Sequence, residues 1–155
     1  MDSKPFFEWA DGLALSAWIR DSRVLFPVIE VIHILALTVL LGSIVILSMR
    51  LLGAGLKQIP VKQLGATLAP FTNVGLVTML LSGALLFGSE ALKCYENPPF
   101  FFKMAMLALA LVFHFTVMRP ALQAEASGLR AKATAAVALL LWFTVGVGGR
   151  AIGFY

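Results

Sequence analysis

Four long apolar stretches, separated by short polar connections, dominate the hydropathy pattern of the chain. They cover approximately residues 24–49, 66–89, 99–118 and 133–149. A helix needs about 20 apolar residues to cross the roughly 30 Å hydrocarbon layer of a bilayer, and each stretch is near that length or longer. The alternating pattern of β-barrel strands is absent, and backbone groups in lipid must be satisfied within their own segment. We therefore expect four transmembrane helices.

The connections between these stretches are short, which predicts that successive spans run antiparallel. Gly53 and Pro60 interrupt the helix between the first two spans. Residues 97–99 (Asn-Pro-Pro) form a turn sequence in which proline opens the third span. These features favour an all-α, up-and-down four-helix membrane bundle that forms a single domain over residues 1–155.

The segment before the first span, residues 1–22, is too short and too polar to cross a membrane. It combines Trp9 and Trp18 with the acids Glu8 and Asp11. Tryptophan prefers the membrane–water interface, so we expect an interfacial helix or, as the alternative, a helix packed over the end of the bundle. A cleaved signal peptide is not expected, because no basic start leads directly into an apolar core with a small-residue cleavage site.

Composition supports a membrane protein and excludes several other classes. The chain is 60% hydrophobic and 13% charged, whereas soluble domains carry about 25% charged residues. The net charge is +4, but the basic residues are scattered, so nucleic acid is not an expected partner. The expected partner is the lipid bilayer. Cys94 is the single cysteine, which excludes an intramolecular disulfide. No P-loop, GxSxG or HExxH motif occurs, and enzymatic activity is left open.

The distribution of lysine and arginine bears on orientation. The first and third connections carry six basic residues, and the opposite end also carries six. Lys4, Lys103 and Arg150 are discounted from the second group, because they lie inside a span, at its edge or far from one. The remaining bias places the first and third connections in the cytoplasm and both termini outside it.

Ionisable side chains within or beside the apolar stretches are the candidate functional residues, because such groups are costly in lipid and usually face the bundle interior. At 1.5 Å per residue, Glu30 and His33 lie about 9 Å and about 14 Å from the outer end of the first span. Lys103 and Arg150 lie about 6 Å in, and Glu90 ends the second span. Glu30 and His33, three residues apart, share one helix face. We therefore expect a polar layer in the outer half of the bundle.

This polar layer has a structural and a functional interpretation. Glu30, Lys103 and Arg150 could form salt bridges that set the register of the helices, since buried charges persist when they are paired. The functional alternative is a site for a proton, a polar ligand or a quinone head group.

His33 and His114 are the two histidines of the chain, and both lie within expected spans. Histidines on different helices of a membrane bundle suggest axial ligation of haem b. His114 lies about 8 Å deeper than His33, however, whereas one iron needs both ligands at nearly the same height. Met104 and Met106 are closer to His33 in depth and offer an alternative second ligand, although methionine more often fills core space. A hydrogen bond to a neighbouring helix is the structural alternative for each histidine.

A metal-ion site is a further alternative. Glu30 and His33 form half of the motif found in di-iron bundles, but the second half and two further glutamates are missing, so a di-iron centre is rejected. A mononuclear site could use Glu30, His33 and Glu90, with His114 as another candidate ligand. Cys94 could add a thiolate for copper, although a lone cysteine in a loop is more often incidental.

The stretch CYENPPFFFK, residues 94–103, resembles the signature before the third helix in a widespread group of small bacterial membrane proteins of unknown function. Further matches are a histidine in the first span, Ser-Glu ending the second, Phe-His late in the third and a closing Gly-Arg. Ala151 departs from the group, which tends to have an aromatic residue there. The matching positions are Tyr95, Asn97, Pro98, Phe100, Lys103, His33, Ser89, Glu90, Phe113, His114, Gly149 and Arg150.

The likeness covers nearly the whole chain and implies a four-helix fold in the bacterial inner membrane, with the charge bias then placing both termini on the periplasmic side. It implies no function. In architecture alone the chain is also distantly similar to CopD-type copper-resistance membrane domains and to small b-type cytochromes, and fold does not determine function.

Three functions follow as expectations. The first is a haem b-binding electron-transfer protein that exchanges electrons with quinone or a redox partner. In it, His33 and His114 ligate iron, while Glu30, Lys103 and Arg150 hold propionates or a quinone carbonyl. The second is a copper or other metal-ion binding or transport protein. The third is a non-catalytic membrane subunit, and a homo-oligomer is left open.

Overall fold

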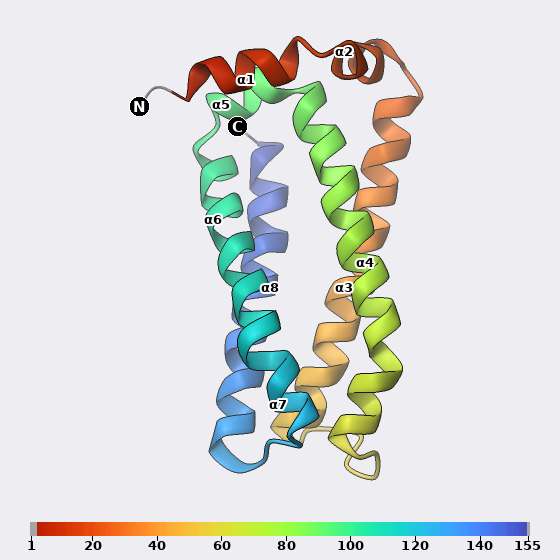
Figure 1. Cartoon of the computed structure of the whole chain (residues 1–155), viewed down its shortest axis with the longest axis vertical. Coiled ribbons are helices and arrows are strands. Elements are labelled where there is room, and N and C mark those ends of the chain that lie inside the picture. The colour runs from red at the N-terminus through yellow and green to blue at the C-terminus, as the bar shows by residue number, and fades with distance from the viewer. Residues whose placement is uncertain (1–2, 155) are drawn as a thin grey trace.

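Four long helices form an up-and-down bundle with both chain ends at the same end of it (Figure 1). The structure is a computed structural model that describes residues 3–154, and in that range every regular element is helical. Each long helix has the length and apolar composition to cross a membrane, which makes the chain a multi-pass membrane protein and confirms the predicted all-α fold. The spans are α3 (Leu25–Leu52), α4 (Val61–Ser89), the continuous stretch Pro98–Gln123, and α8 (Gly128–Ile152).

The helices extend beyond the apolar stretches that predicted them. Helix α4 begins at Val61 rather than near residue 66, and α8 covers Gly128–Ile152 rather than 133–149. The 28 residues of α3 make a helix about 42 Å long, which is longer than the roughly 30 Å hydrocarbon layer. The additional turns therefore reach the head-group region, where polar side chains are tolerated and the backbone still needs hydrogen-bond partners.

The third span changes its helical geometry near the end of the bundle opposite the termini (Figure 1). Helix α6 (Pro98–Phe113) continues into the π-helical turn η1 (His114–Met118) and then into α7 (Arg119–Gln123). The sequence predicts a connection from residue 119 onward, whereas residues 119–123 are helical. Pro120 lacks a backbone N–H and crowds the preceding turn, which explains the departure from α geometry just before it.

The N-terminal segment forms two helices rather than the single helix predicted. Helices α1 (Lys4–Asp11) and α2 (Ala14–Asp21) lie across the end of the bundle that holds both termini (Figure 1). The backbone N–H of Gly12 donates to the Glu8 carbonyl at 3.0 Å and ends α1. Leu13 has an extended backbone, so the chain changes direction between α1 and α2.

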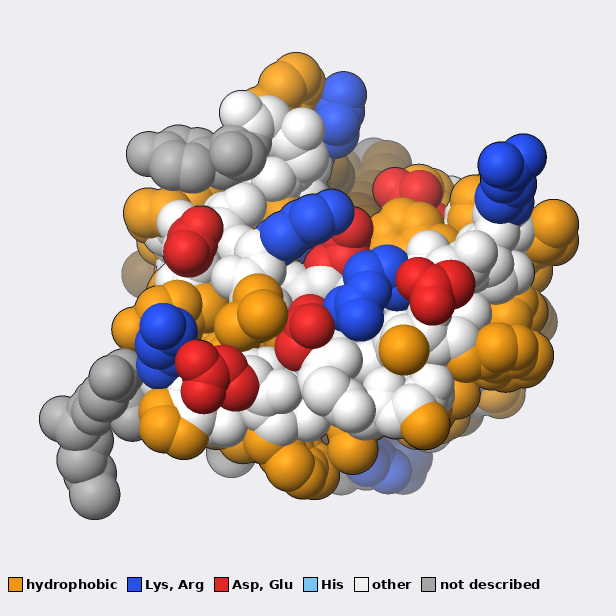
Figure 2. Space-filling view, turned by 90° about the horizontal axis from the view of Figure 1, so that it is seen from above, with side chains coloured by type: hydrophobic (Ala, Val, Ile, Leu, Met, Phe, Trp, Pro, Cys, Tyr) orange, Lys and Arg blue, Asp and Glu red, His pale blue; other side chains and the backbone are white. Residues whose placement is uncertain are grey.

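One face of this N-terminal pair is buried and the other is exposed. Phe7 and Ile19 pack against the bundle, whereas Trp9 and Trp18 are exposed. The pair therefore covers the bundle end and also presents tryptophans outward, which combines the two alternatives expected from the sequence. Figure 2 looks onto this end and shows acidic and basic side chains side by side, with hydrophobic side chains around the rim.

Close packing is unequal on the four sides of the bundle. Helix α3 packs against α4 and α8, and α6 packs against α8. Where α4 crosses α3, a Cβ added to Gly75 would lie 3.1 Å from the Ala36 carbonyl oxygen, so these backbones approach closely, as the small residue predicts. Gly42, by contrast, has no such neighbour within 4 Å.

The side between α4 and α6 is closed at its ends and lacks comparable helix packing along its length, within residues 3–154. At the terminal end, Phe87 stacks on Phe100 with ring centroids 5.5 Å apart. At the other end, Gly65 lies against Leu122. The half of the bundle nearest the termini is therefore flanked by a side on which the helix backbones approach less closely.

Candidate functional site

His33 faces α4 rather than lipid, and its imidazole is held there by a hydrogen-bonded chain. His33 Nδ1 lies 3.0 Å from Ser82 Oγ, and Ser82 Oγ donates to the Thr78 carbonyl at 2.6 Å. The Thr78 carbonyl is within reach of the Ser82 hydroxyl proton, an arrangement that favours Ser82 Oγ as the acceptor for a proton on His33 Nδ1. The Met79 carbonyl, 3.3 Å from Ser82 Oγ, is a second acceptor beside the same imidazole.

This chain of hydrogen bonds favours one tautomer of His33, the one that carries the proton on Nδ1. With the proton on Nδ1, the other ring nitrogen, Nε2, keeps an unprotonated lone pair. A histidine that ligates a metal or accepts a proton is commonly oriented in this way, with its other nitrogen donating to a fixed acceptor. The arrangement provides a positioned acceptor or ligand atom at His33.

Gly83 makes this position available to the imidazole. A Cβ at Gly83 would lie 3.1 Å from His33 Cε1 and 3.6 Å from Nδ1, which is closer than ordinary van der Waals contact for the nearer atom. The ring therefore packs directly on the backbone of α4. The close approach at Gly83 is what a small residue in a span predicts, whereas sequence reasoning missed Ser82 as the partner of His33.

Lys103 enters the same outer layer from α6. Its side chain lies along Gly148 and Gly149 of α8, where added Cβ atoms would be 3.3 Å from Lys103 Cβ and 3.4 Å from Nζ. Lys103 also lies within electrostatic range of His33. No carboxylate pairs with this lysine in the part of the chain that the structure describes.

Three of the expected members of the polar layer lie elsewhere. Glu30 is exposed on the surface of the bundle and has no ion pair among the described residues. Glu90 pairs with Lys93 at the end of α4. The Arg150 guanidinium is exposed and rests 4.2 Å from the centre of the Phe154 ring. The expected salt-bridge network is therefore absent within residues 3–154. Of the expected polar layer, His33 and Lys103 remain.

His114 occupies a separate and deeper position. It is eleven residues beyond Lys103 on the same span, which places it about 16 Å further along the bundle. Its ring is buried and packs edge-on against Phe115 and Trp142, with centroids 5.1 Å and 6.3 Å away. His114 Nδ1 and Trp142 Nε1 are both buried without a hydrogen-bond partner in the described structure.

Residue spacing disfavours one haem ligated by both histidines. The iron needs two axial ligands at nearly one height, whereas spacing along the helices places His114 about 8 Å deeper than His33. Met106 is half-buried against the core and Met104 is exposed, so neither stands out as a replacement ligand.

The metal-ion alternative also lacks an assembled ligand set. No group of three or more His, Cys, Asp or Glu side chains that could hold a metal occurs among the described residues. Cys94 lies in the short helix α5 (Ala91–Tyr95), outside the spans. Burial and the Glu90 carboxylate raise the pKa of the Cys94 thiol to about 11, so the thiol of the metal-free protein stays protonated at neutral pH.

Comparisons with known proteins agree with the resemblance seen in the sequence. No curated protein and no solved structure matches the chain significantly, so the suggested likeness to CopD-type domains and b-type cytochromes finds no support there. One family model, described as a family of unknown function (DUF6644), matches residues 6–155. Because this match covers nearly the whole chain, the protein belongs to that family of unknown function.

Proposed function

We propose that this protein is a membrane redox protein that binds a quinone in the outer half of the bundle, beside His33 and Lys103. The observation that carries the proposal is the pairing of a positioned imidazole acceptor with an ammonium group that has no carboxylate partner among the described residues. An ionisable residue that remains unpaired inside a membrane is costly, and such residues mark ligand or proton pathways.

The two groups have the complementary chemistry that a quinone requires. A quinone supplies two oxygens that exchange electrons and protons as it cycles between its carbonyl and hydroxyl forms. The Lys103 ammonium would donate a hydrogen bond to one oxygen. His33 Nε2 would accept a hydrogen bond from a quinol hydroxyl, while Ser82 keeps the ring oriented through Nδ1. The electrons of the quinol would pass to a separate redox partner protein. The ligand would enter from the lipid at the side between α4 and α6, where the two backbones approach each other less closely than on the other sides of the bundle.

Haem b is a second candidate, and one observation favours it. The unprotonated Nε2 of His33 is also the nitrogen that ligates iron, and Lys103 suits a propionate. Such a haem would use His33 without His114. A spectrum of purified protein, oxidised and then reduced with dithionite, separates the candidates: sharp reduced α and β bands support haem, and their absence from cells supplied with haem excludes it.

We also propose that the protein lies in the bacterial inner membrane with both termini on the periplasmic side. Once Lys4, Lys103 and Arg150 are discounted, the end that holds the termini carries three basic residues, against six at the end opposite the termini. The basic residues at that end are Arg50, Lys57, Lys62, Arg119, Arg130 and Lys132. A basic end of this kind is typical of the cytoplasmic side.

The quinone proposal is tested by a matched pair of cation variants. Purified protein in nanodiscs is titrated with a short-chain ubiquinone, and bound ligand is measured after separation. We expect Lys103→Met to weaken binding about tenfold, the equivalent of one charge-assisted hydrogen bond of roughly 1.4 kcal/mol. Arg150→Met removes a cation from the same end of the bundle, where the guanidinium contacts Phe154, and should bind as the wild type does. Equal losses in both variants, or no saturable binding by the wild type, would refute the proposal.

A further inference from the structure

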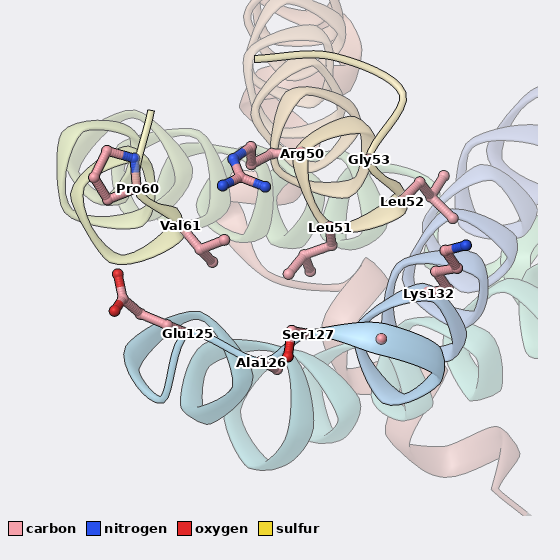
Figure 3. A pocket seen from close by; sticks show the side chains of 11 residues that line it. Arg50, Leu51, Leu52, Gly53, Pro60, Val61, Glu125, Ala126, Ser127 and Lys132 are labelled. Atoms are coloured by element: carbon pink, nitrogen blue, oxygen red, sulfur yellow. The ribbon is translucent and has the colours of Figure 1, made fainter. Parts of the chain in front are cut away.

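A pocket of about 400 Å³ lies at the end of the bundle opposite the termini (Figure 3). Its walls come from the end of α3, the start of α4, the connection between α7 and α8, and the first turns of α8. Its volume lies within the range of small-ligand sites. Neither His33 nor Lys103 lines this pocket, so a ligand bound there would not depend on the proposed quinone site.

Arg50 is the anchored cation of this pocket. Its Nε donates to the Ile59 carbonyl at 2.7 Å, which ties the guanidinium to the connection between α3 and α4. No carboxylate pairs with Arg50 among the residues that the structure describes. The guanidinium therefore keeps terminal N–H groups for a ligand, in a planar arrangement that suits a phosphate.

The start of α8 adds positive potential beside Arg50. Ser127 precedes the helix without a side-chain hydrogen bond that caps it, so the first N–H groups of a 25-residue helix have no side-chain partner there. Lys132 lies one turn further along and also lines the pocket. Two cations and the start of α8 thus line one cavity.

Glu125 is the one acidic residue among the pocket residues, and it does not neutralise these cations. It forms no ion pair with Arg50 or Lys132. Figure 3 shows its carboxylate on the side of Pro60 and Val61, whereas Lys132 lies on the other side. The balance of charge in the pocket is therefore positive.

We propose that this pocket binds the phosphate of an anionic phospholipid head group in the adjacent leaflet. The pocket lies where the apolar spans end, which is the level of the head groups. Leu51, Leu52 and Val61 line it together with the cations, and an apolar wall of this kind suits the glycerol and upper acyl carbons of a lipid. Free phosphate shares the ionic contact but gains nothing from that wall.

Retention of lipid through native mass spectrometry tests this site. Protein from nanodiscs that contain phosphatidylglycerol and phosphatidylcholine is released, and bound lipid is counted. We expect one phosphatidylglycerol per chain in the wild type and about tenfold weaker retention in Arg50→Gln/Lys132→Gln. Lys57→Gln/Lys62→Gln removes the same charge at the same end, outside the pocket, and should retain lipid.

Two controls keep the result interpretable. Because Arg50 also anchors Ile59, Lys132→Gln alone is measured as well, and thermal melting verifies that each variant is folded. Equal retention of phosphatidylcholine, or equal loss in both double variants, would overturn the proposal in favour of diffuse charge. Displacement of the lipid by millimolar inorganic phosphate would also overturn it and identify the pocket as a free-phosphate site.

Discussion

The contact between Gly83 and His33 makes a sharp prediction, because the same substitution has an uncrowded counterpart elsewhere in the bundle. Gly83→Ala places a Cβ 3.1 Å from His33 Cε1, whereas Gly42→Ala meets nothing within 4 Å. Both glycines lie inside long helices, so alanine should contribute about 1 kcal/mol of helix propensity at either position. The difference between the two variants therefore isolates the contact with the imidazole.

The magnitude follows from how little the imidazole can move. Its Nδ1 is bonded to Ser82 Oγ at 3.0 Å, so a shift of a few tenths of an ångström away from α4 lengthens that hydrogen bond. Crowding of this kind in a packed interior costs about 1–3 kcal/mol. We therefore expect Gly42→Ala to raise the free energy of unfolding by about 1 kcal/mol. Gly83→Ala should lie about 1–3 kcal/mol below it, near the wild type or less stable.

Reversible unfolding in mixed micelles, followed by circular dichroism, measures both variants against the wild type. The quinone titration should show a parallel effect, since displacement of His33 disturbs the acceptor at Nε2 in Gly83→Ala alone. If the two variants have equal stability and equal affinity, the imidazole does not pack on α4 as described, and the site built on His33 fails with it.

Two further predictions concern exposed ends of the bundle. Because the pKa of Cys94 is raised to about 11, its alkylation by a neutral maleimide should stay slow at pH 8 and accelerate steadily through pH 9–11. An alkylation rate that levels off near pH 9 would show an ordinary thiol. The raised pKa of Cys94 also predicts that the free energy of unfolding falls as the pH rises through this window, because the thiol ionises first in the unfolded state. For orientation, Lys57→Cys in a Cys94→Ser background should react with a membrane-impermeant maleimide only after the cells are opened, whereas Leu15→Cys should react in intact spheroplasts. The reverse pattern would invert the proposed topology.

The fold was predictable because each span carries its own signal. Apolar length identifies a transmembrane helix, and Asn97 with two prolines marks the start of the third span, where Asn97 Oδ1 accepts from the Phe100 N–H. The end of α3 was also predictable, since Gly53 adopts the left-handed conformation, φ 75°, that favours glycine.

The rotation of each helix about its own axis was not predictable in the same way. Helix α3 is apolar on all sides, so no amphipathic pattern indicates which face meets the bundle. The contact of Gly75 with Ala36 and Leu40 sets that rotation, and it turns His33 toward α4 while leaving Glu30 exposed. The depth of a residue along its helix could be calculated from residue spacing. The direction in which its side chain points depends on how the helix packs against its neighbour.

The most direct test of the account compares the two histidines. Purified wild type, His33→Leu and His114→Leu are titrated with a short-chain quinol under anaerobic conditions, and the bound fraction is measured. We expect saturable binding that is weakened at least tenfold in His33→Leu and retained in His114→Leu. Retention in His33→Leu, or an equal loss in both variants, would contradict the claim that the outer pair His33 and Lys103 forms the site.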